Sequence, residues 1–139
     1  MSYHARKALE QIDIFSGLPE DVLNELVQRG TTLTLAPGQH VVEQGAVDAG
    51  LQVVLDGSAD VSVNGVTRHS LEPGSYFGEI SMIDGLPRSA TIAAGANGLT
   101  TFALSTLAFA PMMERPEVSR VLMQALCARL REVEASQRA

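Results

Sequence analysis

The chain has 139 residues, of which 45% are hydrophobic and 19% charged, and this length suggests one domain and argues against a two-domain enzyme. Ten Lys and Arg residues against sixteen Asp and Glu residues give a net charge of −6, the wrong sign for a protein that neutralises DNA or RNA phosphates. A single cysteine, Cys127, excludes an internal disulfide framework and a four-cysteine zinc site. The charged start has no apolar run, so we expect neither a secretion signal nor membrane insertion, and predict a cytoplasmic protein.

Helical spacing dominates the first thirty residues. A short helix is predicted over residues 5–11, and a second over residues 19–29, where apolar side chains recur at helical intervals before the stop signal Gly30. From about residue 31 to residue 110 the period changes to two, which indicates short strands. Within that segment Asn64-Gly65 predicts a tight hairpin, because both central residues of such a turn need positive φ. Closely spaced turns between short strands favour a barrel or a sandwich.

Helical spacing returns after Pro116 and continues almost to the end of the chain. We expect Cys127, inside this helix, to be buried as a small apolar residue. The residues predicted to form one apolar face are Val118, Val121, Leu122, Ala125, Leu126, Leu130 and Val133.

Positive charge is scarce in the long middle segment. Residues 31–113 contain seven acidic side chains and only two basic ones, Arg68 and Arg88. An anionic ligand bound in this segment would therefore depend on one of these two arginines and on backbone N–H groups.

The most informative stretch is residues 74–92. It predicts a glycine-opened turn, a short helix over residues 79–84, a second turn, and a strand that follows Arg88. The first N–H groups of such a helix point outward, and Arg88 and Ser89 can add a guanidinium and a hydroxyl donor to the same anion. Glu79 would repel a free anion but can accept hydrogen bonds from a pair of hydroxyls, such as those of a ribose. The combination predicts a nucleotide that carries one phosphate charge.

Two short runs, Phe77-Gly78-Glu79 and Pro87-Arg88-Ser89-Ala90-Thr91-Ile92, resemble the phosphate-binding cassette of the cyclic nucleotide-binding domain family. This family includes catabolite activator proteins and the regulatory subunits of cAMP-dependent kinases. The resemblance extends to residues 12–19, which are similar to the family's N-terminal helical motif. It implies a mostly β protein with flanking helices: an eight-stranded, jelly-roll-like β-roll. Residues 1–139 would form one domain, with N-terminal helices (1–30), the β-roll (31–113, cassette 74–92) and a C-terminal lid helix (114–139).

The resemblance also implies roles for single residues. Arg88 would pair with the exocyclic phosphate oxygens, Ser89 would donate to the phosphate, and Glu79 would accept from the ribose 2′-hydroxyl. Val63 and Leu71 would line the purine side, and Arg129 of the lid helix would stack on the purine through a cation–π contact. The full predicted set of ligand-binding residues is Val63, Leu71, Phe77, Gly78, Glu79, Ile80, Ser81, Arg88, Ser89, Ala90 and Arg129.

The predicted function is therefore binding of cAMP, with cGMP as the alternative, by a non-enzymatic sensor whose C-terminal helix moves. The resemblance implies that Ser89 favours cAMP, because within that family a threonine at this position tends to accompany cGMP. The expected partners are the nucleotide and another protein or a second copy of the chain. A different interpretation is a scaffold or dimerisation module with an unused pocket. A metal enzyme built around His40 and Glu43 is disfavoured, because a catalytic metal usually needs three converging ligands, so no metal or further cofactor is expected.

Overall fold

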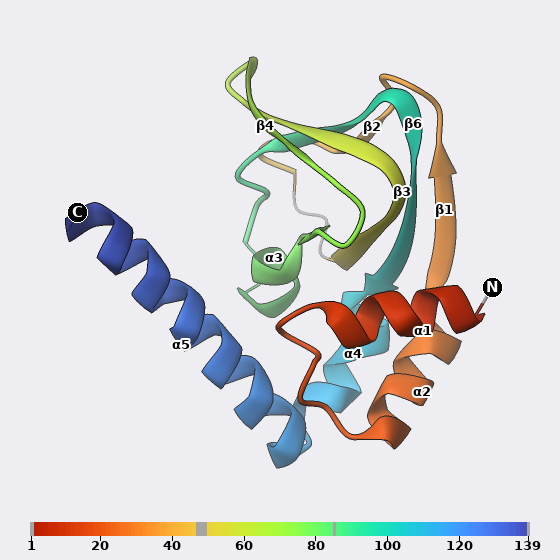
Figure 1. The fold of residues 1–139 in the computed structure, drawn as a ribbon, viewed down its shortest axis with the longest axis vertical. Helices are drawn as coiled ribbons and strands as arrows, with labels where there is room; N and C mark the ends of the chain where they lie inside the picture. Colours follow the sequence, from red (N-terminus) through yellow and green to blue (C-terminus); the bar gives the residue numbers. More distant parts are fainter. Residues whose placement is uncertain (1, 47–49, 85, 139) are drawn as a thin grey trace.

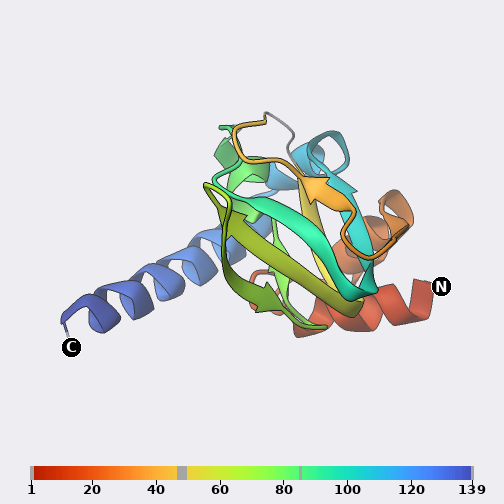
Figure 2. The ribbon, with the colours of Figure 1, turned by 90° about the horizontal axis from the view of Figure 1, so that it is seen from above.

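The computed structural model describes residues 2–46, 50–84 and 86–138. Its strands form one antiparallel sheet in the order β1-β6-β3-β4, which curls into a roll, with β2 added to β6 and β5 added to β3 (Figures 1 and 2). The strands are β1 (Thr31–Leu35), β2 (His40–Val42), β3 (Gly50–Val63), β4 (Val66–Leu71), β5 (Tyr76–Phe77) and β6 (Thr91–Ser105). The predicted β-roll with flanking helices is confirmed.

The described residues form six strands and not the expected eight, because β3 and β6 are long and continue through a bend. Their register shifts on both sides of Gly57, as expected for bulges that bend a strand without ending it. Gly57 has a φ of +79°, and a Cβ there would lie 2.2 Å from the carbonyl oxygen of Gly98. The predicted hairpin between β3 and β4 is confirmed, since Asn64 and Gly65 have φ values of 53° and 79°.

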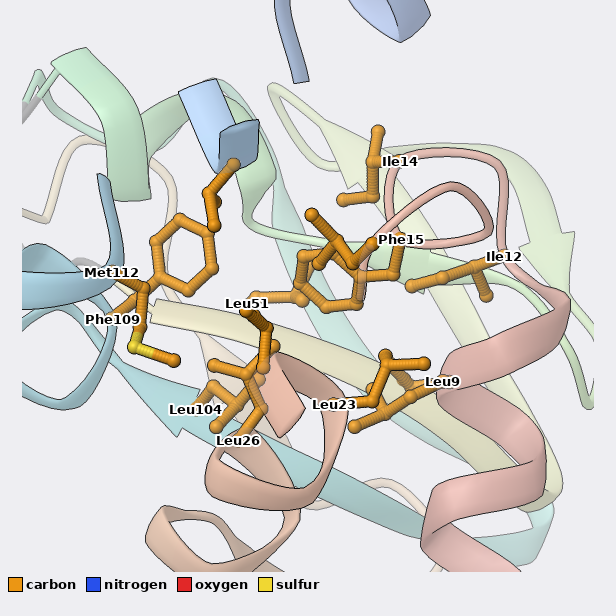
Figure 3. Close-up of a cluster of buried hydrophobic side chains, with 14 of the residues drawn as sticks. Leu9, Ile12, Ile14, Phe15, Leu23, Leu26, Leu51, Leu104, Phe109 and Met112 are labelled. Atoms are coloured by element: carbon orange, nitrogen blue, oxygen red, sulfur yellow. The ribbon is translucent and has the colours of Figure 1, made fainter. Parts of the chain in front are cut away.

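Three helices gather at one end of the strands: α1 (Ser2–Gln11), α2 (Glu20–Arg29) and α4 (Thr106–Met113) (Figure 1). They enclose the larger of two apolar cores, in which the rings of Phe15 and Phe109 lie 5.8 Å apart (Figure 3). The helices α1 and α2 confirm the prediction for the first thirty residues.

Helix α4 corrects the prediction that the β-roll continues to residue 113. The hydroxyl of Ser105 accepts a hydrogen bond from the backbone N–H of Ala108 at 3.1 Å and so caps the start of this helix. Periodicity alone does not separate a short apolar run in a strand from one in a buried helix, which is why the pattern was ambiguous here.

The smaller core fills the inside of the roll. It is built from buried side chains of β2, β3, β5 and β6: Val42, Val54, Ala59, Val61, Phe77, Ile92, Ala94 and Leu99. This core supports the floor of the cavity described below.

Helix α5 (Pro116–Arg138) begins against the helical core and then extends away from the body of the protein (Figures 1 and 2). Val118 and Leu122 are buried, whereas Leu130 and Val133 are 63% and 52% exposed. The predicted C-terminal helix is confirmed, but only its first half buries an apolar face. The expectation that Cys127 is buried is wrong, because its side chain is exposed. No helix in the described part of the chain is both long enough and apolar enough to cross a membrane.

Candidate ligand-binding site

A cavity of about 300 Å³ lies between the inner face of the roll, α3 (Glu79–Asp84) and α5. Strand side chains form an apolar wall on one side, and the polar side chains come from the cassette, from α5 and, in the case of His69, from β4. The residues that line it are Val42, Val61, His69, Leu71, Tyr76, Phe77, Gly78, Glu79, Ile80, Arg88, Ser89, Ala90, Ile92 and Arg129.

Arg88 is buried and its backbone and side chain are both fixed. Its backbone N–H donates to the carbonyl of Ala46 at 2.9 Å, and its carbonyl accepts from the N–H of Gly45 at 2.8 Å. Its guanidinium Nη2 donates to the carbonyl oxygen of Gly50 at 3.0 Å. These contacts from the segments beside β2 and β3 place a planar cation at the cavity wall.

Gly78 brings the cassette backbone against this cation. Its φ is +89°, and a Cβ there would lie 2.0 Å from the carbonyl oxygen of Gly50 and 2.5 Å from Nη1 of Arg88. Only glycine fits, because any side chain would meet backbone and guanidinium at once. A ligand group next to Gly78 can therefore approach the main chain and Arg88 together.

Glu79 and Arg129 form an ion pair at the mouth of the cavity. Nη1 of Arg129 donates to Oε2 of Glu79 at 2.7 Å, and the Glu79 side chain is 9% exposed. The Arg129 guanidinium also lies over the ring of Tyr76, 5.4 Å from its centroid. Burial lowers the pKa of Arg129 and the hydrogen bond to Glu79 raises it, with a net upward direction, so Arg129 is a cation.

Tyr76 connects this ion pair to the N-terminal helices. Its hydroxyl donates a hydrogen bond to the carboxylate of Asp13, which lies between α1 and α2. Burial, followed by the hydrogen bond to Asp13, raises the pKa of Tyr76 well above its usual value, so the hydroxyl keeps its proton. The ring of Tyr76 is thus held in one place beneath Arg129.

The cavity is suited to a ligand that has a flat ring and, elsewhere in the molecule, one negative charge. Two guanidinium groups and one carboxylate line it, which leaves one net positive charge when His69 is neutral. The apolar wall of Val42, Val61, Leu71 and Ile92 can pack against a planar ring. Among the described residues, no group of three or more His, Cys, Asp or Glu side chains could hold a metal ion.

Most of the predicted site residues lie together at this cavity. The lining includes Leu71, Arg129 and the predicted cassette residues 77–80 and 88–90. Val63 is not part of the lining: it pairs with Val66 beside the hairpin, and Val61, two residues earlier in β3, lines the cavity in its place. The side chain of Ser81 lies outside the part of the chain that the structure describes.

Sequence reasoning missed five lining residues: Val42, Val61, His69, Tyr76 and Ile92. The alternation of strand side chains could have indicated two of them. Val61 lies two residues from Val63, and His69 lies two residues from Leu71, so in a regular strand each pair shares one face. Val61 lines the cavity and Val63 does not, whereas His69 and Leu71 both line it, and the register of β3 against β4 shifts between Val61 and Ser62.

A family model described as "Cyclic nucleotide-binding domain" matches residues 32–115, more than half of the chain, and includes the whole cassette. The chain belongs to the cyclic nucleotide-binding domain family. The resemblance seen in the sequence is confirmed, and the matched range includes every residue that lines the cavity except Arg129.

Two curated relatives are kinase proteins. A cGMP-dependent protein kinase of Plasmodium berghei is 35% identical over 89 residues, covering 64% of this chain and 10% of the kinase. A cAMP-dependent protein kinase regulatory subunit of Yarrowia lipolytica is 32% identical over 88 residues, covering 62% of this chain and 24% of that subunit. The chain therefore spans only a tenth to a quarter of these relatives.

A solved structure matches over nearly the whole chain. The N-terminal domain of a transcriptional regulator from Streptomyces coelicolor has a TM-score of 0.79 at 26% identity and covers 94% of each chain. The cyclic nucleotide-binding fold of this chain, including its flanking helices, is thus shared with a domain of similar extent.

Proposed function

We propose that this protein binds cAMP, with cGMP as the weaker ligand, and converts occupancy of the cavity into a movement of α5. The observation that carries the proposal is the buried guanidinium of Arg88, held against the side-chain-free backbone of Gly78 at the cavity wall. A fixed planar cation beside free approach to backbone N–H groups is an arrangement that recognises a phosphate.

The remaining groups fit the other parts of a cyclic nucleotide. Ser89 lines the cavity beside Arg88 and would donate its hydroxyl to the phosphate, with the backbone near Gly78, Ile80 and Ala90 adding N–H groups. Glu79 would accept a hydrogen bond from the ribose 2′-hydroxyl. The purine would lie against the apolar wall of the roll. Ser81, which belongs to the cassette, is also part of the proposed binding site.

The preference for cAMP rests on Ser89 and remains part of the proposal. One curated relative is a cGMP-dependent kinase and the other a cAMP-dependent kinase subunit, so kinship supports either nucleotide. We also propose that the chain acts as a cytoplasmic binding module and not as an enzyme. The free thiol of Cys127 is compatible with the reducing cytoplasm.

The proposed movement of α5 is supported by how this helix is held. Its first half is anchored by Val118 and Leu122 in the helical core, and further along Arg129 links it to the cavity. A ligand shifts the equilibrium between two positions of a helix only by the difference in its affinity for them. The contacts at the cavity mouth therefore have to differ between the two positions of α5.

Titration calorimetry with cAMP, cGMP and 5′-AMP tests the binding proposal. We expect heat from both cyclic nucleotides at micromolar concentration, stronger binding of cAMP, and weaker binding of 5′-AMP, whose open phosphate carries a second charge. Absence of heat with both cyclic nucleotides would overturn the sensor function and favour a scaffold with an unused pocket.

We further propose that α5 pairs, between Met123 and Val133, with the same helix of a second copy. Apolar residues occur there at spacings of three, four and three: Met123, Leu126, Leu130 and Val133. This is the spacing of a two-stranded coiled-coil seam, and three of the four side chains are largely exposed. The seam covers less than two heptads, so we expect a weak dimer.

Leu130→Glu is expected to abolish this dimer, because the new carboxylate would be buried at the seam against the same carboxylate of the second copy. Sedimentation velocity over a concentration series measures the change. Ala128→Glu is the control, since residue 128 is exposed and lies on the opposite side of the helix. A wild-type chain that stays monomeric at high concentration, or equal effects of both variants, would contradict the proposed pairing.

A further inference from the structure

A second cavity lies next to the start of the cassette, between α1, the middle of β3 and the turn that joins β4 to β5. Its volume is about 290 Å³, close to that of the cavity described above, which we now call the first cavity. The second cavity is lined by Lys7, Ala8, Gln11, Val54, Leu55, Pro73 and Gly74. No described residue lines both cavities, so a molecule bound in the second would not occupy the first.

A tight turn forms the wall of the second cavity on the cassette side. The backbone N–H of Ser75 donates to the carbonyl of Glu72 at 3.0 Å, with Pro73 and Gly74 at the two central positions. Gly74 has a φ of +95°, as the second central residue of a type II turn requires. The N–H of Gly74 donates to the carbonyl of Val54 at 2.9 Å, and the N–H of Val54 donates to the carbonyl of Ser75 at 2.8 Å. These bonds hold the turn on β3, so this wall is formed before any ligand arrives.

Small residues keep the second cavity open. Ala8 of α1 has only a methyl group, and a Cβ at Gly74 would have nothing within 4 Å. Lys7 and Gln11 are four residues apart on α1, so their side chains are neighbours on the helix surface. Both are exposed, whereas Leu55 is half-buried and packs against the larger core. The polar groups therefore lie at the rim of the cavity and the apolar groups lie deeper.

Lys7 gives the second cavity a positive charge. It is the only charged residue in the part of the lining that the structure describes, and it is the only lysine in the sequence. Its ammonium group has three N–H donors, so it can bond to a ligand and to a protein group at the same time. The acidic residues next in sequence to the lining, Asp56 and Glu72, do not themselves line the cavity. A ligand with one negative charge complements this lining.

We propose that the second cavity binds a small amphiphilic carboxylate, whose charged end bonds to Lys7 and Gln11 and whose apolar part packs against Leu55 and Pro73. The volume sets the size of this ligand. A cavity of about 290 Å³ holds about ten groups of the size of a water molecule, at about 30 Å³ each. The ligand is therefore a short acyl or aryl carboxylate. This site does not depend on the proposed binding of a nucleotide.

The proposed site contacts the cassette from outside the first cavity. Pro73 and Gly74 line the second cavity, and Tyr76, two residues after Gly74, lines the first. On the α1 side, Asp13 follows the lining residue Gln11 by two residues and accepts the hydrogen bond from the hydroxyl of Tyr76. Both walls of the second cavity therefore lead to the same residue of the first cavity.

Binding of octanoate and of its uncharged counterpart octan-1-ol tests the proposal. Reductive ¹³C-methylation labels only Lys7 and the N-terminal amine, because the chain has one lysine, and the methylated lysine keeps its charge. We expect octanoate at millimolar concentration to shift the Lys7 signal in a saturable way. In a titration followed at the ¹⁵N backbone amide of Gly74, octanoate should bind about two- to fivefold more tightly than octan-1-ol.

Three variants identify the site. Lys7→Gln should reduce the affinity for octanoate to that for octan-1-ol, whereas Arg68→Gln, the matched control, should leave both affinities unchanged. Arg68 is exposed on β4, lines neither cavity and loses the same charge. Ala8→Leu should weaken binding of both compounds, because the larger side chain fills the cavity. Arg88→Ala, a change in the first cavity, should not alter the affinity for octanoate.

Other results would overturn the inference. Equal affinities of the wild type for octanoate and octan-1-ol, or equal effects of Lys7→Gln and Arg68→Gln, would show that Lys7 does not bind the carboxylate. Weaker binding of octanoate by a folded Arg88→Ala protein would place the compound in the first cavity. Unchanged binding by a folded Ala8→Leu protein would show that the compound lies outside the second cavity. If Ala8→Leu does not fold, the comparison of Lys7→Gln with Arg68→Gln decides, and none of these measurements requires nucleotide binding.

Discussion

Replacing Arg88 by alanine is expected to weaken cAMP binding by about ten- to a hundredfold, because a hydrogen bond to a charged group contributes about 1.5–3 kcal/mol. Arg88 is the buried one of the two cations in residues 31–113, and it faces the cavity beside Gly78. Removing it would leave the cavity with Arg129 paired to Glu79 and no cation for the phosphate. Titration calorimetry measures the loss.

Arg68→Ala is the control for this experiment. Arg68 is the other cation of the same segment, and it is exposed on β4 away from the cavity lining. Since Arg88 also bonds to the carbonyl of Gly50, thermal unfolding should accompany the titration. Arg88→Lys keeps the charge but loses the two-pronged geometry, so its affinity should lie between those of the wild type and Arg88→Ala. Unchanged binding by a folded Arg88→Ala protein would show that the phosphate binds elsewhere.

Gly78→Ala is expected to abolish measurable nucleotide binding and to lower the free energy of unfolding. A left-handed backbone conformation costs a residue with a Cβ about 1–2 kcal/mol. The added methyl would also meet the carbonyl oxygen of Gly50 at 2.0 Å and Nη1 of Arg88 at 2.5 Å. Relief of such a collision typically costs about 1–3 kcal/mol more, and here it would displace the guanidinium that we assign to the phosphate.

Gly74→Ala is the control that separates the free-energy cost of the left-handed backbone from the cost of the steric collision. Gly74 lies in the same cassette with a φ of +95°, and a Cβ there would have nothing within 4 Å. Both variants should lose the free energy that a left-handed backbone costs a residue with a Cβ. Only Gly78→Ala should also lose nucleotide binding and a further part of the free energy of unfolding. Chemical denaturation and calorimetry on both proteins measure these effects. Equal losses would mean that the close approach at Gly78 does not shape the site.

Local sequence was enough to predict the cassette and most of the secondary structure. A glycine-opened turn, a short helix and a following strand depend on neighbouring residues, so residues 74–92 could be interpreted without knowing the rest of the fold. The same holds for the hairpin at Asn64-Gly65 and for helices α1 and α2. The scarcity of cations in residues 31–113 then directed attention to Arg88.

Contacts between distant segments could not be predicted in this way. Val61 and Val63 are the same residue type two positions apart in β3, but Val61 lines the cavity whereas Val63 pairs with Val66 beside the hairpin. The helical state of α4 depends on the Ser105 cap and on burial of Phe109 against Phe15. Each of these outcomes depends on packing partners that periodicity does not identify.

The sequence by itself determined that this protein is a small acidic domain of the cyclic nucleotide-binding family, and it predicted a phosphate cassette at residues 74–92. Only the tertiary structure decided what α5 does at the site. Helical spacing predicts one apolar face along the helix, but the body of the protein ends before the helix does, so Leu130 and Val133 stay exposed. The crossing of α5 past α3 places Arg129 on Glu79 and Tyr76, because a side chain's partner is set by the path of the chain through space.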